Sequence, residues 1–317
     1  MNRYKNRRFP RIGCFLLALP LIALAPAACV SSGSSGSPRE ALSTISSIAR
    51  ETSGAVNRME SALSKLNEEE ATSEDGYYIG RAVGANILTI YPPWERNPGL
   101  TAYLNKICAA IVINSPQPEL YAGYHVMILD SPEINAFATP GGHIFLTRGI
   151  VASAASEDAL AAVIAHEAAH IQLQHSLDLI NNLRLLQNLT EVADTAADIA
   201  SRALSQERKQ LFSDSVRELV NTMIRNGYSQ AQEFDADKTA LSLMASAGYN
   251  PVSFSDMLSA LDRAQAKTPG GFNTTHPSPR LRLANVERNL RSYRVEDTRI
   301  FRKSRFEAAA PPGLLSN

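Results

Sequence analysis

The segment "AVIAHEAAHIQLQH", residues 162–175, constrains this chain more than any other stretch, because it places three of the six histidines within ten residues. Small and apolar residues surround these histidines, as in a helix that is buried in a protein core. Two interpretations follow. The histidines are core residues with satisfied ring nitrogens, or they belong to a metal site whose remaining ligands lie elsewhere in the chain.

The spacing of His166 and His170 favours the metal site. Residues four apart on a helix share one face, with an offset of about 40° around the axis, so both imidazoles can reach one ion. Glu167 is offset by about 100° from His166, where its carboxylate could take a proton from a water molecule at the ion. This is the HExxH pattern that zinc peptidases use.

A third ligand on the same segment would require a glycine and a further histidine after the motif. Leu173 and Ser176 stand at those two positions, so the sequence does not match this type of site. His175 is one residue too early, because five residues beyond His170 is about 140° around the axis if the helix continues. We therefore expect His175 at the surface or behind the ligands, and not as a ligand.

A second segment offers the missing ligand. "YSQAQEFDADKTALSLMASAG", residues 228–248, predicts a helix with Glu233 and Asp237 on one face and Ala236 permitting close approach of another helix. Glu233 would complete a site of two histidines and one glutamate, with one position left for water. Asp237 could accept a hydrogen bond from a ligating histidine. The alternative is that both acids are simply solvated.

The motifs "HEAAH" and "EFDAD" together resemble the HtpX-like zinc metallopeptidases of the gluzincin type. Two further stretches agree: "NAFATPGGHIFLTRGI" resembles the strand before that family's motif helix, and "HPSPRLR" resembles its HP-four-residues-R motif. The resemblance extends from Ala71 to Arg291. It is strongest to the soluble periplasmic lipoprotein branch, similar to LoiP and YcaL, with a BepA-like peptidase domain but without the helical repeats.

For the site, the resemblance implies one Zn²⁺ per chain, bound by His166, His170 and Glu233. It implies that Glu167 is the general base and that Asp237 lies behind the ligands. It also implies that His276 and Arg282 approach the metal or the developing oxyanion from the other side. Arg280 is a possible rival to Arg282.

The beginning of the chain is typical of an exported protein. Basic residues without an acid precede a short apolar run, which predicts a signal peptide over residues 1–28. "PAAC" resembles a bacterial lipobox and makes Cys29 the lipidated first residue, followed by a flexible tether over residues 29–38. Ordinary cleavage after Ala27 is the alternative. By resemblance, Val30 favours sorting to the outer membrane, on its periplasmic side.

Charge and cysteine use narrow the partners. The chain has 31 basic and 31 acidic residues, and five of the basic ones lie in the leader, so the mature part carries a net charge of about −5. No basic patch lies outside the leader, which argues against nucleic acid as a partner. Cys108 lies on an apolar helical face, as a buried thiol would, so we expect no internal disulfide.

The hydrophobic pattern predicts an α+β, mostly helical fold with a small β-sheet beside the HExxH helix. Predicted helices cover residues 39–66, 78–90, 100–113 and most of 157–266, and predicted strands cover 124–130 and 143–149. We expect a single zincin-like metallopeptidase domain over residues 39–303, with an insert over residues 176–226. A tail over residues 304–317 follows it. The insert is helical and could act as a lid or a subunit interface, and the tail is expected to be loose.

These features predict a zinc-dependent endopeptidase of the bacterial cell envelope. Zinc-activated water, with Glu167 as general base, would hydrolyse peptide bonds of misfolded or unassembled envelope proteins. If the strand with His143, Ile144 and Phe145 is a sheet edge, it could hold an extended substrate by backbone pairing. We also expect the protein to contact the membrane through its lipid anchor and to have a partner from an assembly machinery.

Two other classes remain open. One is a lipid-anchored assembly or chaperone factor for outer-membrane proteins with a structural zinc site, which would not need Glu167. The other is a helical structural lipoprotein without metal, which would require each matched motif to be accidental.

Overall fold

A computed structural model of the 317-residue chain describes residues 72–182, 227–265, 279–293 and 297–310, together with 217, 220, 221, 223, 224, 275 and 276. The predicted signal peptide, Cys29, the tether and the helix over residues 39–66 lie outside this part of the chain, as does most of the insert over 176–226. They stay predictions. None of the described helices has the length and apolar character needed to cross a membrane.

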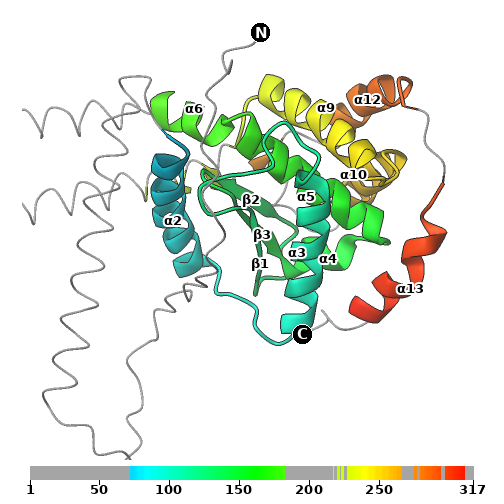
Figure 1. Cartoon of the computed structure of the whole chain (residues 1–317), viewed down its shortest axis with the longest axis horizontal. Helices are drawn as coiled ribbons and strands as arrows, with labels where there is room; N and C mark the ends of the chain where they lie inside the picture. The colour runs from blue at the N-terminus through cyan, green and yellow to red at the C-terminus, as the bar shows by residue number, and fades with distance from the viewer. Residues whose placement is uncertain are drawn as a thin grey trace, which may run out of the picture. The chain divides into compact units, whose positions relative to one another are not determined.

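The described residues form a helical domain around a small sheet (Figure 1). The helices are α2 (Ser73–Ile90), α3 (Pro98–Val112), α4 (Arg148–Ser153), α5 (Glu157–Gln172), α6 (His175–Asn182), α9 (Gln230–Ser246), α10 (Val252–Gln265), α12 (Pro279–Leu290) and α13 (Ile300–Ala309). The strands are β1 (His125–Leu129), β2 (Ala136–Thr139) and β3 (His143–Thr147). The predicted α+β, mostly helical class is confirmed.

The sheet differs from the prediction in its middle. Its order is β1-β3-β2, with β1 parallel and β2 antiparallel to β3. Strand β2 was expected to be part of a connection, because four residues that are all buried give no alternating pattern. The predicted end of β3 at Gly149 is also wrong, because Thr147 caps α4 by accepting a hydrogen bond from the Ile150 N–H.

Strand β3 is therefore the central strand and has backbone partners on both sides. The expectation that His143, Ile144 and Phe145 lie on an edge and hold a substrate by backbone pairing is wrong for this reason. Of the two edge strands of the described sheet, β2 is the one that packs against α5.

Helix α5, which contains the HExxH motif, is the centre of the domain. All of its residues are buried, and it contacts α3, α9, α10 and β2. Figure 1 shows α5 passing between the sheet and the pair α9 and α10. Ser156 caps it, as predicted, by accepting a hydrogen bond from the Ala159 N–H at 3.2 Å. Because alanine fills much of its surface, neighbouring helices approach its backbone closely.

Cys108 and the C-terminal helix α13 complete the described part of the fold. Cys108 is 1% exposed in α3, as expected, and burial raises the pKa of its thiol to about 12. The prediction of a loose tail from residue 304 is wrong as far as Ala309, because α13 continues to that residue. Arg302 and Arg305 of α13 hydrogen-bond Asp158 and Glu157, distant partners that no local pattern reveals. Residues 311–317 lie outside the described part.

Candidate metal centre

Two packed helices bring the three predicted ligands together. His166 and His170 lie on α5, with their Nε2 atoms 3.0 Å apart. Glu233 lies in the first turn of α9, where a capping box between Ser229 and Gln232 starts the helix. Its Oε2 lies 3.4 Å from His166 Nε2 and its Oε1 lies 3.4 Å from His170 Nε2. Ala236, which is fully buried, permits this close approach.

His276 joins this group. Its Nδ1 lies 2.8 Å from Glu233 Oε1 and 3.5 Å from His166 Nε2. One ligand atom from each of four buried residues lies within 4.8 Å of the others, and the four are His166, His170, Glu233 and His276. The resemblance implied that His276 approaches the metal from the other side, and the structure has it in contact with a ligand carboxylate.

Asp237 and Arg282 lie behind the ligands. Asp237 Oδ1 is 3.1 Å from His166 Nδ1, the contact expected for an acceptor that orients a ligating histidine. Arg282 is 1% exposed and donates from Nε to Asp237 at 2.9 Å, while its Nη1 lies 3.2 Å from Glu233 Oε2. Its guanidinium thus balances the negative charges of Asp237 and of Glu233, which is itself one of the predicted ligands. Arg280, the rival, is exposed.

The buried charges shift one another's protonation. Burial and Arg282 lower the pKa of His166, but contacts with Asp237 and Glu233 outweigh them and raise it to about 9. Burial would raise the pKa of Glu233, whereas the positive charges of His276 and Arg282 hold it well below its usual range. A metal at His166 must therefore displace a proton, which makes its binding dependent on pH.

Glu167 is the unusual carboxylate of the centre. It is fully buried, and neither carboxylate oxygen has a hydrogen-bond partner. Its Oε1 lies 3.9 Å from His276 Nε2. Burial raises its pKa, so it accepts a proton more readily than an exposed glutamate does. A buried carboxylate without a hydrogen bond destabilises a fold, and such groups are found where a bound ion or a reaction needs them.

His175 does not lie where a continued helix would put it. Helix α5 ends at Gln172, Gln174 adopts a left-handed φ of 59°, and α6 begins at His175 in a new direction. His175 is 5% exposed, and its Nδ1 lies 3.0 Å from Nδ1 of His170. A surface position for His175 is therefore wrong, and the alternative position behind the ligands is the one that the structure has.

Tyr228 is a residue of the centre that sequence reasoning missed. Its ring stacks on His170 with centroids 4.0 Å apart and an interplanar angle of 21°. Its hydroxyl lies 2.7 Å from Ser176 Oγ. The capping box at Ser229 was the available signal, because it places Tyr228 immediately before α9 and close to Glu233.

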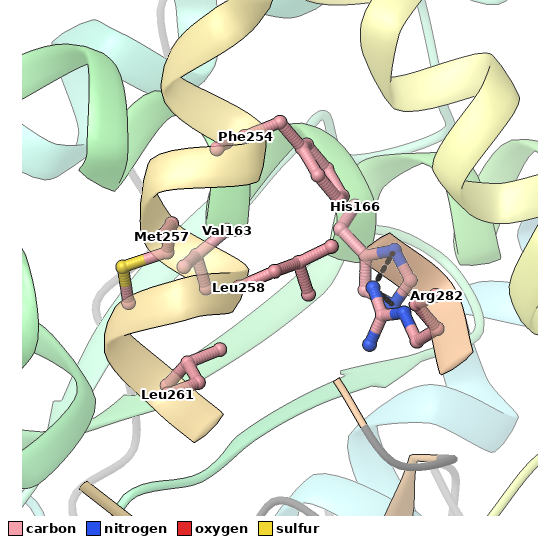
Figure 2. A pocket seen from close by; sticks show the side chains of 8 residues that line it. Val163, His166, Phe254, Met257, Leu258, Leu261 and Arg282 are labelled. Atoms are coloured by element: carbon pink, nitrogen blue, oxygen red, sulfur yellow. Dashed lines mark hydrogen bonds between the residues drawn. The ribbon is translucent and has the colours of Figure 1, made fainter. Parts of the chain in front are cut away.

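A small, largely apolar pocket adjoins the centre (Figure 2). Its lining comes from α5, α10 and α12, namely Ala162, Val163, His166, Phe254, Met257, Leu258, Leu261 and Arg282. In Figure 2, His166 and Arg282 lie together at one end of the pocket, and Met257 and Leu261 lie at the other. A pocket of this lining favours an apolar side chain beside the metal group.

The open side of β2 faces this region. The Thr147 N–H donates to the Asn135 carbonyl, so the backbone groups of Asn135 point toward β3. Because this direction alternates from one residue to the next along an antiparallel strand, the N–H and C=O of Ala138 point away from β3. The Ala138 carbonyl accepts a hydrogen bond from Ser176 Oγ at 3.1 Å and from the Tyr228 hydroxyl at 3.4 Å. Ala138 is 1% exposed, so two side chains, from α6 and the start of α9, cover the outward side of β2 at its carbonyl.

The donor set suits zinc. Imidazole nitrogens and a carboxylate oxygen are common zinc ligands, and zinc accepts the four-coordinate arrangement that four converging side chains permit. Carboxylate-rich sites for calcium or magnesium need six or more oxygens, which this group does not provide. The buried, unpartnered carboxylate of Glu167 next to the group is a further feature that a bound cation would compensate.

Comparison with known proteins agrees with this geometry. The sequence model described as peptidase family M48 matches residues 96–290. The chain is 28% identical over 234 residues to the mitochondrial metalloendopeptidase OMA1 of Schizosaccharomyces pombe, covering 73% of this chain and 64% of that protein. It is 25% identical over 236 residues to the beta-barrel assembly-enhancing protease of Escherichia coli K12, covering 74% of this chain and 46% of that protein. The match thus spans less than two thirds of either relative.

Proposed function

The chain belongs to peptidase family M48, and on that premise we propose that it is a zinc-dependent endopeptidase of the bacterial cell envelope. The observation that carries the proposal is Glu167, a fully buried carboxylate without a hydrogen bond beside four converging metal-ligand side chains. When bound, zinc would supply Lewis acidity toward a peptide carbonyl and toward water.

Each residue then has a task that follows from its surroundings. His166, His170 and Glu233 would hold the metal, and Asp237 would keep the His166 ring oriented through the 3.1 Å contact to Nδ1. Glu167 would act as general base, because its raised pKa suits a group that must accept a proton and then give it to the leaving amine.

The role that we propose for Arg282 differs from the one that the resemblance implied, whereas His276 keeps its implied place at the metal or the oxyanion. Arg282 is committed to Asp237 and Glu233, so we assign it to positioning and charge balance of the ligands. His276 contacts Glu233 and is close to Glu167, so it would act at the metal as a further ligand or as a hydrogen-bond donor to a substrate oxygen.

A polypeptide substrate is supported by two features next to the metal group. An extended peptide could pair with the outward edge of β2 in place of Ser176 and Tyr228, which contact the Ala138 carbonyl, and such pairing reads little sequence. The small apolar pocket at His166 could contact an apolar side chain near the bond that is cut. Together they favour unfolded segments that expose apolar residues, as in misfolded or unassembled proteins.

The envelope role rests on the sequence before residue 72 and on the name of one relative. A leader over residues 1–28, a lipobox-like Cys29 and a short tether favour the lipid-anchored periplasmic branch of HtpX-like peptidases at the outer membrane. The Escherichia coli relative is named a beta-barrel assembly-enhancing protease, so unassembled outer-membrane proteins are the substrates that we propose. Cys29→Ser should abolish labelling by radioactive palmitate and release the chain from membranes; retention of both would contradict lipidation.

One observation favours a second candidate. Four side chains can close a zinc site, as in structural sites, and His276 supplies the fourth. In that case the protein would be an assembly or chaperone factor with structural zinc. The two candidates predict different results for His276→Asn: a structural site loses zinc and unfolds more easily, whereas a catalytic site keeps zinc on three ligands.

Casein hydrolysis tests the main proposal. The wild-type chain should digest casein, a chelator should stop digestion, and added zinc should restore it. Glu167→Gln should keep its zinc and lose about 10²–10⁴-fold in rate, the usual contribution of a general base. Digestion that persists in Glu167→Gln, or that ignores the chelator, would contradict the enzyme.

A further inference from the structure

His170 is held on two sides by residues to which the proposed mechanism gives no task. Its Nδ1 lies 3.0 Å from Nδ1 of His175, and its ring stacks on Tyr228. The other α5 ligand, His166, is different, because the carboxylate of Asp237 faces its Nδ1. The two ligands therefore rest on chemically different neighbours.

The geometry fixes which nitrogen of His170 must carry the proton. A neutral imidazole has one donor and one acceptor nitrogen. Nε2 of His170 faces the ligand group, 3.4 Å from Glu233 Oε1 and 3.0 Å from His166 Nε2. A metal at Nε2 needs the lone pair of that atom, so the proton must lie on Nδ1. The Nδ1–H then requires an acceptor, and Nδ1 of His175 lies at hydrogen-bond distance.

We propose that His175 is a positioning residue whose Nδ1 accepts the Nδ1–H of His170 and so fixes the tautomer that presents Nε2 to the metal. The inference rests on the zinc site of the proposed function and adds a residue to it. Each histidine ligand of α5 then has its own acceptor, Asp237 for His166 and His175 for His170. Histidine ligands of metals generally need such a partner on the nitrogen that does not bind the metal.

The turn between α5 and α6 is built to make this contact. Gln174 has the one positive φ among non-glycine residues of the described part, a conformation that costs roughly 1–2 kcal/mol. Ser176, next to His175, hydrogen-bonds the hydroxyl of Tyr228, whose ring covers His170. The strained turn and this hydrogen bond hold His175 against His170 from two directions.

The test is the zinc affinity of the full-length chain, measured by competition with a chromophoric chelator. His175→Asn keeps an acceptor, because Asn Oδ1 occupies the place of Nδ1. His175→Gln puts its acceptor at the place of Nε2, and His175→Leu has none. We expect His175→Leu and His175→Gln to weaken zinc binding about 10–100-fold, as loss of a ligand's hydrogen-bond partner usually does. His175→Asn should stay near wild type, and so should His125→Leu, a control at an exposed histidine.

Several outcomes would overturn the inference. Wild-type zinc affinity in His175→Leu would do so, and so would equal weakening by the Asn and Gln variants, because packing alone would then explain the loss. The comparison of Asn with Gln decides the matter even if the Leu variant does not fold. A wild-type chain that binds no zinc, or a His166→Ala variant that keeps full affinity, would instead contradict the proposed function itself, so the two failures are distinguishable.

Discussion

The two halves of helix α5 differ in the hydrogen bonding of their buried carboxylates. At its start, Glu157 and Asp158 are 2% and 1% exposed, and arginines of α13 hydrogen-bond both. Glu157 also accepts hydrogen bonds from the hydroxyls of Tyr103 at 2.6 Å and Tyr249 at 3.0 Å. Ten residues further along, Glu167 is equally buried and accepts no hydrogen bond.

The pKa directions follow from this difference. Burial alone would raise the pKa of Glu157, but hydrogen bonds from Arg305, Tyr103 and Tyr249 lower it below its usual range. Burial raises the pKa of Glu167, because the nearby positive charges do not compensate it. The start of α5 thus stabilises the fold, whereas the motif half keeps a carboxylate that is costly to the fold and available for chemistry.

The largest expected effect is at the motif half. Glu233→Gln keeps the shape of the side chain but replaces a carboxylate ligand with a neutral amide, so we expect zinc affinity to fall at least about a hundredfold, with loss of hydrolysis. Glu157→Gln, the matched change at the start of α5, should keep wild-type zinc affinity. Chelator competition measures both, and equal losses in the two variants would remove the distinction between the halves.

The next effect is on stability, at the partnered half. Asp158→Ala leaves Arg302 and the Asn250 N–H without their acceptor, so we expect the free energy of unfolding to fall by about 3 kcal/mol. Zinc affinity should not change. Asp256→Ala is the control, because the Asp256–Arg299 pair is exposed and contributes less than about 1 kcal/mol. Urea unfolding measures both, and equal losses would contradict a special role for the α13 contact.

A smaller effect concerns acid. Because the folded-state pKa of Glu157 is lowered, its stabilisation is present above the unfolded-state pKa of about 4.3 and is lost as the pH falls through the folded-state value. Urea unfolding of the metal-free chain should therefore show a difference between wild type and Glu157→Gln at about pH 6 that shrinks toward about pH 3. A difference that does not depend on pH would contradict the charged state of Glu157.

The smallest effect is at the turn after the motif. Gln174→Gly relieves the left-handed backbone, so we expect a gain of about 0.5–1 kcal/mol in the free energy of unfolding, with His175 still in place. Thermal unfolding measures it, with Gln174→Ala as the control that retains the strain. A loss of stability in the glycine variant would mean that the Gln174 side chain, and not its backbone, holds the turn.

The sequence predicted what local periodicity and motif spacing determine. The pairing of His166 with His170, the ligand on a second helix and the cap at Ser156 follow from rules of helix geometry, and all three agree with the structure. The fold class followed in the same way. The short strand β2 did not, because four buried residues give no periodic signal.

What the sequence missed depends on the path of the chain or on distant partners. The sequence could not decide between the two positions expected for His175, because one left-handed residue ends α5 early and glutamine is not a usual residue for that conformation. Helix α13 was missed because its stability comes from acids almost 150 positions earlier. The central position of β3 could not be known until β2 was recognised, because the strand order depends on it.

The central claim is that Glu167 is kept unpartnered for chemistry at the cost of stability. The direct measurement is Glu167→Gln, assayed in one preparation for zinc content, casein hydrolysis and free energy of unfolding. We predict one zinc per chain, a rate that is about 10²–10⁴-fold lower, and a stability equal to or above that of the wild type. Hydrolysis at the wild-type rate, or a large loss of stability with zinc retained, would contradict the account.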